Sequence, residues 1–217
     1  MIVVPAPLEI EKDVLIQDIN RLVPFFSRFQ IDIGDGEFVK NMTVQTTEFA
    51  NSFSSLQRVE HVVFDFHLMV KDPLPHIEAL QKLPKKNIGV VFVHMAVFPQ
   101  ENIGGFGLAL SPEDKVESIS DALISTLPAV QIMTVYPGFQ GQPFLPEMLI
   151  KIEQLRKRGY KREILIDGGV NEKTLVHVLQ QKYIPDVSCV GSFLTKAPTE
   201  ELGQRVRYLK STIDSTE

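Results

Sequence analysis

Short apolar segments recur along the chain, rich in Val, Ile and Phe and with little alternation of polar and apolar residues. This pattern is typical of strands that are buried on both faces, as in a parallel sheet. Segments with helical periodicity lie between them. The predicted strands are Ile2–Ala6, Phe29–Ile33, Val62–Leu68, Gly89–His94, Phe106–Leu110, Val130–Val135, Glu163–Ile166 and Val187–Val190.

The predicted helices carry their apolar residues on one side. In one of them Leu149, Ile152 and Leu155 share a side, with a proline near the start and a glycine just after the end. The segment Pro99–Gly105 is too short for more than one helical turn. The predicted helices are Glu11–Leu22, Asp114–Leu127, Pro146–Arg158, Glu172–Gln181 and Glu200–Ser211.

The number of strands indicates the fold. Eight strands in 217 residues leave roughly 27 residues for each strand–helix unit, close to the lower size limit of a (β/α)8 barrel. A doubly wound open sheet is the alternative, and its dinucleotide-binding form should show G-x-G-x-x-G after the first strand. The first strand is instead followed by PAPLEIEKD, without glycine. We therefore predict one α/β domain over residues 1–217, a (β/α)8 TIM barrel.

Composition narrows the class of protein. The chain is 44% apolar and 23% charged, as in a soluble globular protein with a sizeable core, and its net charge of −5 without a Lys/Arg stripe argues against nucleic acid. The longest nearly apolar run, Ile88–Phe98, is too short for a membrane span, and the N-terminus lacks the basic region of a signal peptide. Cys189 is the only cysteine, which fits a reducing compartment. We expect a cytoplasmic protein that binds neither membrane nor nucleic acid.

Two aspartates stand at predicted strand ends, where a barrel carries its chemistry. Asp32 in QIDIG and Asp167 in LIDGG each follow a branched apolar residue. Two carboxylates facing each other across the barrel mouth could act on opposite faces of one carbon. With His67 between them in the ring of strands, they predict a metal or acid–base site. The alternative is that each aspartate is a helix cap or turn residue and that His67 is a buried core histidine.

The other histidines are not assigned to this site. His94 ends a predicted strand and is interpreted as structural. His61, His76 and His177 fall at strand starts or on helices and are expected at the surface.

Glycine-rich turns follow the last three predicted strands, in VYPGFQGQPF, DGGV and GSF. Glycines let backbone N–H groups approach an anion closely, and a barrel commonly binds phosphate at these loops. The alternative is that the glycines only permit tight turns. The predicted phosphate-binding residues are Gly138, Gly141, Gly168, Gly169, Gly191 and Ser192.

Five ordered motifs over nearly the whole chain resemble the ribulose-phosphate 3-epimerase family of ribulose-phosphate-binding barrels. The stretch IDIGDGEFVKN resembles the family's H-x-D-V-M-D-G-x-F-V-P-N, and DFHLMV is similar to its D-x-H-L-M. The stretch VYPGFQGQPF resembles V-x-P-G-F-G-G-Q-x-F, IDGGVN resembles V-D-G-G-V, and CVGSFL carries the G-S turn.

The resemblance implies epimerisation of D-ribulose 5-phosphate to D-xylulose 5-phosphate at carbon 3. It implies Asp32 and Asp167 as the two acid–base residues and a divalent metal that stabilises the enediolate. The implied metal ligands and substrate-lining methionines are Gln30, Asp32, His67 and Asp167 for the metal, and Met69 and Met133 for the substrate.

The chain departs from the family pattern at several positions. Gln30 replaces a histidine, and an amide oxygen is a weaker ligand that suits Mn or Mg better than Zn. The divalent metal, which is Zn, Fe, Mn or Mg, is therefore expected to be weakly bound or absent. A substrate-contacting serine is aligned with Pro7, a methionine with Gly34, and a glycine of the phosphate loop with Gln140.

Three functions remain open at this stage. The chain is an active ketopentose-phosphate epimerase, a sugar-phosphate-binding relative without activity, or an isomerase of another phosphosugar with a wider space at Pro7 and Gly34. The retained carboxylate pair favours an enzyme, because a binding protein has no use for two facing acids that repel each other. The expected partner is a small phosphorylated sugar, and a homo-oligomer is compatible with the sequence.

Overall fold

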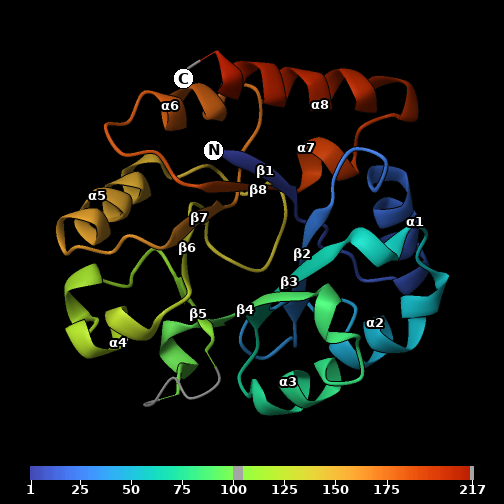
Figure 1. Ribbon diagram of the computed structural model, residues 1–217, viewed down its shortest axis with the longest axis horizontal. Coiled ribbons are helices and arrows are strands. Elements are labelled where there is room, and N and C mark those ends of the chain that lie inside the picture. Colours follow the sequence, from blue (N-terminus) through green and yellow to red (C-terminus); the bar gives the residue numbers. More distant parts are fainter. Residues whose placement is uncertain (100–104, 216–217) are drawn as a thin grey trace.

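The computed structural model describes residues 1–99 and 105–215. Its eight strands form a single sheet in the order β1-β8-β7-β6-β5-β4-β3-β2, and all the ladders between them are parallel. Strands β1 and β2, at the two ends of this order, lie beside each other, so the sheet curls into a nearly closed barrel (Figure 1). The strands are β1 Ile2–Pro5, β2 Arg28–Gly34, β3 Val63–Met69, β4 Ile88–His94, β5 Gly107–Leu110, β6 Ala129–Met133, β7 Glu163–Asp167 and β8 Val187–Val190.

Helices surround these strands (Figure 1). The predicted (β/α)8 barrel is thus confirmed, and all eight strands lie close to their predicted positions. The α-helices are α1 Lys12–Leu22, α2 Thr46–Ser52, α3 Leu74–Leu80, α4 Asp121–Thr126, α5 Ile150–Lys157, α6 Thr174–Leu179, α7 Ser192–Thr195 and α8 Thr199–Asp214. Short 3-10 helices are η1 Phe53–Ser55, η2 Val59–His61, η3 Lys85–Asn87, η4 Met95–Val97, η5 Val116–Ser118 and η6 Pro146–Leu149.

The helices differ from the sequence prediction more than the strands do. Helices α2 and α3 were not predicted, because each has only seven residues and offers too few turns for a periodic pattern. The predicted helix Asp114–Leu127 is α-helical only over α4, whose start is set by the Ser120 hydroxyl accepting a hydrogen bond from the Leu123 N–H. The prediction at Pro99–Gly105 falls on residues 100–104, outside the described part of the chain.

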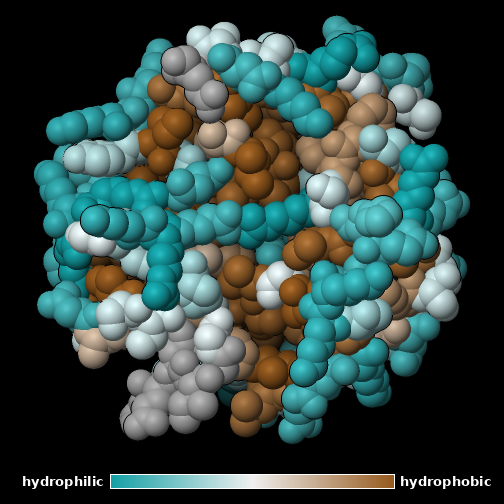
Figure 2. Space-filling view, in the orientation of Figure 1, coloured by the Kyte–Doolittle hydropathy of each residue, from teal (hydrophilic) through white to brown (hydrophobic). Residues whose placement is uncertain are grey.

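Apolar side chains are buried on both sides of the sheet. A large cluster lies between strands and helices, and a smaller one of mostly small residues, including Ala109, Ala129 and Cys189, fills the barrel interior. Figure 2 shows hydrophobic residues toward the centre of the drawn face, crossed by a band of hydrophilic residues, and further hydrophilic residues around the edge. Burial on both faces is why the strands read as unbroken apolar runs.

No helix within the described ranges is both long and apolar enough to span a membrane. The cytoplasmic location stays a prediction.

Candidate active site

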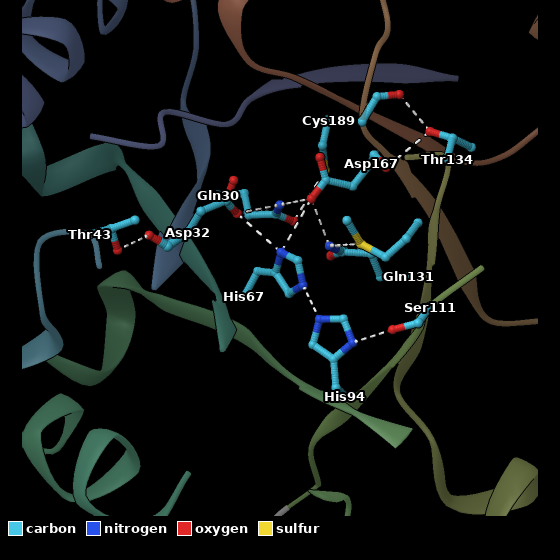
Figure 3. A network of polar contacts seen from close by, with 12 residues as sticks. Gln30, Asp32, Thr43, His67, His94, Ser111, Gln131, Thr134, Asp167 and Cys189 are labelled. Carbon is cyan, nitrogen blue, oxygen red and sulfur yellow. Dashed lines mark hydrogen bonds and ion pairs between the residues drawn. The ribbon is translucent and has the colours of Figure 1, made fainter. Parts of the chain in front are cut away.

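The strand register brings the two aspartates and one histidine together. Asp32 on β2 and His67 on β3 are direct register partners, and Asp167 is the last residue of β7. His67 Nδ1 lies 3.2 Å from Asp32 Oδ1 and 3.3 Å from Asp167 Oδ2 (Figure 3). All three side chains are buried. The predicted constellation is therefore assembled, and neither aspartate is merely a solvent-exposed turn residue.

The backbone behind each aspartate is tethered by a threonine. Thr43 Oγ1 donates to the Asp32 carbonyl at 2.9 Å, and Thr134 Oγ1 donates to the Asp167 carbonyl at 3.0 Å. These bonds join the ends of β2 and β7 to neighbouring loops. They hold the two carboxylates at fixed positions in the barrel mouth.

Gln30 lies two residues before Asp32 on β2 and therefore points to the same side of the sheet. Its Nε2 donates to Asp32 Oδ1 at 2.9 Å and to Asp167 Oδ2 at 2.7 Å, while its Oε1 accepts from the Cys189 thiol at 3.2 Å (Figure 3). The opposite amide orientation would set Oε1 against two carboxylate oxygens. The amide therefore bridges the acids through its N–H groups.

Gln131 on β6 was missed by the sequence analysis. Its Nε2 donates to Asp167 Oδ2 at 2.9 Å, so this oxygen accepts from two amides. The signal for this residue was a glutamine inside the apolar strand AVQIM, two positions before Met133 and hence on the same side. Cys189, which in the sequence indicated only a reducing compartment, likewise belongs to this network.

A second histidine continues the network behind His67. His67 Nε2 lies 2.8 Å from His94 Nε2, and His94 Nδ1 lies 3.1 Å from Ser111 Oγ. Burial, and then the charge of His67, lowers the pKa of His94 well below its usual range, so His94 is neutral. His94 Nε2 therefore accepts the His67 Nε2 proton, and its own Nδ1 proton goes to Ser111. His94, interpreted as structural, orients the ring of His67.

The remaining histidines lie apart from this network. His61 and His177 are exposed, as expected. His76 is half-buried, with Nδ1 3.1 Å from Thr46 Oγ1, and so is not the surface residue that we predicted.

Burial and charge shift the proton affinities of the site. Burial, followed by the neighbouring charge of Asp167, raises the pKa of Asp32 to about 6, against the opposing effect of hydrogen bonds from His67 and Gln30. Burial alone would lower the pKa of His67, but hydrogen bonds to Asp167 and Asp32 outweigh it and raise this pKa to about 9. The site thus holds an imidazolium beside a carboxyl group that exchanges protons near neutral pH.

The acids and His67 also form a candidate metal centre. One ligand atom from each of Asp32, His67 and Asp167 lies within 4.8 Å of the others, which fits a divalent ion held by three protein ligands. Gln30 does not fit as a fourth ligand in this orientation, because it presents N–H groups rather than its oxygen. A metal ligand at this position would require the amide to turn over.

A cavity of about 970 Å³ extends from the acids to the glycine-rich turns. Gly168 needs its positive φ, 115°, and a Cβ there would stand 2.4 Å from Val135 Cγ2, so only glycine allows this turn. The outer wall also includes Lys173, Arg205 and Tyr208, which the sequence analysis did not find. Predicted site residues that line the cavity are Asp32, His67, Met69, Met133, Gly138, Gly141, Asp167, Gly168, Gly169, Gly191 and Ser192.

Pro7 and Gly34 do not line this cavity, contrary to prediction. Ala6 and Leu8, on either side of Pro7, line it instead. At Gly34 a Cβ would stand 2.6 Å from the Asn41 carbonyl oxygen and 3.0 Å from Val39 Cγ2. The space beside Gly34 is therefore filled by the following loop, and these two departures do not widen the substrate site.

Comparisons with known proteins identify a family for this chain. Residues 8–192 match the model of the ribulose-phosphate 3 epimerase family. Ribulose-phosphate 3-epimerase from Encephalitozoon cuniculi is 29% identical over 196 residues, covering 87% of this chain and 82% of its own. The enzyme of the same name from Helicobacter pylori strain 26695 is 31% identical over 182 residues, covering 79% of this chain and 81% of its own.

Solved structures support the fold alone. 3-Hexulose-6-phosphate synthase from Salmonella typhimurium has a TM-score of 0.66 at 14% identity, with complete coverage of both chains. Thiamine phosphate pyrophosphorylase from Pyrococcus furiosus has a TM-score of 0.61 at 14% identity, covering 98% of this chain and 96% of its own. Their shared architecture is the barrel described above.

Proposed function

Because the chain belongs to the ribulose-phosphate 3-epimerase family, we propose that it interconverts D-ribulose 5-phosphate and D-xylulose 5-phosphate at carbon 3. One observation carries the proposal. Two buried carboxylates, each within 3.3 Å of the same imidazole nitrogen, lie in a cavity whose outer part is lined by three glycine-rich turns. The turns suit a phosphate, and the carboxylates suit proton transfer.

In this mechanism Asp32 and Asp167 act on opposite faces of carbon 3. One carboxylate removes the proton as the C3–H bond breaks, and the electron pair moves toward the carbon 2 ketone to give an enediolate. The other carboxyl group, protonated, returns a proton to carbon 3 on the opposite face. The raised pKa of Asp32, about 6, is compatible with both protonation states near neutral pH.

The other residues of the site position the two acids and offset their negative charge. In the metal-free protein the His67 imidazolium and the Gln30 amide relieve the repulsion between the two acids, which lie at short distance from each other. A divalent ion would take the place of the His67 Nδ1 proton. Held by Asp32, His67 and Asp167, it would supply a Lewis acid that polarises the ketone oxygen. His94 keeps the His67 Nδ1 atom directed at the two acids.

A sugar-phosphate-binding protein without turnover is the second candidate function. The observation that favours it is Gln30, whose N–H groups engage both acids and thus reduce their basicity. The third possibility, another phosphosugar in a wider site, loses its support because Pro7 and Gly34 do not enlarge the cavity.

The decisive experiment is proton exchange at carbon 3 of ribulose 5-phosphate in deuterated water. It should be run on metal-free protein and after addition of Mn, Zn or Fe(II), with Asp32→Asn and Asp167→Asn as controls. An epimerase incorporates deuterium at carbon 3, and the single variants lose turnover. Binding of the sugar phosphate without deuterium incorporation under any of these conditions would establish the second function instead.

A further inference from the structure

The side-chain amide of Gln140 is buried beside the cavity without a hydrogen-bond partner. Neither Nε2 nor Oε1 bonds to any residue within the described ranges. Leaving two N–H donors and an acceptor unpaired in the interior costs free energy, so such groups usually face a ligand or water that completes them. The family pattern has glycine at this position, so the amide is a feature of this chain.

The position of this amide relates it to the predicted phosphate site. A Cβ on Gly191 would stand 3.3 Å from Gln140 Nε2, so the amide lies directly against the turn after β8. Gln140 itself lies in the turn after β6, and both turns line the same cavity. The backbone N–H groups of Gly169 and Gly191 donate to no residue in the described part of the chain. Donors without acceptors thus occur on three turns that border this part of the cavity.

The amide borders the place where an anion would bind. Nε2 is buried against Gly191, and both residues belong to the same cavity wall. An anion held at Gly191 therefore meets Nε2 when the Gln140 side chain rotates toward the cavity, which gives the unpaired N–H groups an acceptor.

We propose that Gln140 is a specificity-determining residue that donates a hydrogen bond from Nε2 to a phosphate oxygen held against Gly191. This inference rests on the proposed function for the nature of the anion. Phosphate oxygens are strong acceptors, so they complement the unpaired Nε2 donors. The amide adds a side-chain donor to a phosphate-binding site whose other donors are backbone N–H groups.

The test is titration of the full-length protein with inorganic phosphate by calorimetry at constant ionic strength. Gln140→Leu fills the same space without donors, and Gln140→Gly restores the family residue and so keeps the loop foldable. Both should weaken phosphate binding about 10- to 100-fold, the range for a hydrogen bond to a charged group. Gln180→Leu, at the exposed end of α6 and outside the cavity lining, is the matched control and should bind as the wild type does.

Catalysis gives a second readout. Gln140→Leu should raise KM for ribulose 5-phosphate by a similar factor and leave kcat nearly unchanged, because the phosphate contact is the same in the ground and transition states. Phosphate affinity that is unchanged or tighter in Gln140→Gly overturns the inference, and so does a wild type that binds no phosphate.

These results separate the inference from the proposed function. Deuterium incorporation at carbon 3 with phosphate affinity independent of residue 140 refutes the inference alone. Gln140-dependent phosphate binding without deuterium incorporation refutes the epimerase function and leaves the inference standing.

Discussion

Gln30 determines whether Asp32 and Asp167 of the candidate site face N–H donors or a metal ion. The family pattern has a histidine here, whose ring nitrogen can ligate a metal, and this chain has two N–H donors shared between Asp32 and Asp167. Donors bonded to both acids relieve their mutual repulsion without a metal ion. A metal ion and the present orientation of Gln30 are therefore alternatives for the same pair of carboxylates.

Replacing Gln30 by histidine should strengthen metal binding. Gln30→His exchanges an N–H donor for a nitrogen lone pair beside the three existing ligands, and affinity for Zn or Fe(II) should rise by about 10- to 100-fold. Competition titration with a chelating dye measures this affinity. Gln57→His, at an exposed residue outside the cavity lining, is the control. If the wild type already holds Zn as tightly as Gln30→His, the role given to Gln30 is wrong.

His94 should support metal binding from behind His67. His94→Leu removes the acceptor of the His67 Nε2 proton, so the tautomer that leaves Nδ1 free is no longer favoured, and Zn affinity should fall about 10- to 100-fold. His94→Gln keeps a side-chain acceptor and should recover part of the loss. Nitrogen-15 NMR of the His67 ring in the Zn-loaded protein reports the tautomer directly. An unchanged tautomer and affinity in His94→Leu would make His94 a packing residue.

At the level of elements, one arginine ties three strands together at the end of the barrel opposite the reactive site. Arg28 at the start of β2 donates from Nε to Asp65 on β3 at 2.7 Å, and from both terminal nitrogens to Glu163 on β7 at 2.8 and 2.7 Å. The Asp65 side chain is fully buried, so its charge depends on this partner. The pairing explains how a strand can begin with an arginine inside the sheet.

Removing Arg28 should therefore destabilise the whole barrel. Arg28→Met leaves the Asp65 carboxylate buried and unpaired, and the free energy of unfolding should fall by about 3–5 kcal/mol. Lys71→Met breaks the exposed ion pair with Glu37 and should cost only about 0–1 kcal/mol. Urea denaturation measures both. In Arg28→Met, an additional Asp65→Asn should restore part of the stability, and a loss as small as that of Lys71→Met would contradict this account.

For the whole molecule, the site makes the metal-free protein sensitive to pH. The pKa of His67 is raised to about 9 in the folded protein and returns to its ordinary value on unfolding. Above about pH 6.5 the folded chain therefore holds a proton on His67 that the unfolded chain has lost. The contribution of His67 to stability is fully present below that pH and is lost as the pH rises toward 9.

Urea denaturation in the presence of a chelator, between about pH 6.5 and pH 8, tests whether stability falls as the pH rises. The Cys189 thiol of the unfolded chain remains mostly protonated in this range and so contributes little. The wild type should lose on the order of 1–2 kcal/mol over this range. His67→Gln, which has no imidazole to titrate, should show a flatter profile. A wild type whose stability rises with pH would mean that His67 is neutral in the folded protein.

Local pattern was sufficient for the strands, the barrel and the three residues that meet at the candidate site. Strands buried on both faces leave unbroken apolar runs, and an acid or a glycine pair at the end of such a run marks the barrel mouth. Asp32, His67 and Asp167 were found in this way. Helices α2 and α3 were not, because a helix of seven residues has too few buried positions to establish a period.

The tertiary structure alone decided how these groups are paired. Periodicity reports that a residue is buried and does not identify its neighbours, which the strand register selects from distant parts of the chain. Closure of the barrel sets Gln30 against Cys189, 159 positions away, and Arg28 against Glu163, 135 positions away, although their strands do not pair. Register also sets His94 behind His67, which turns an apparently structural histidine into part of the site. Orientation of an amide or an imidazole depends on the donors and acceptors around it, and these exist only once the barrel has closed.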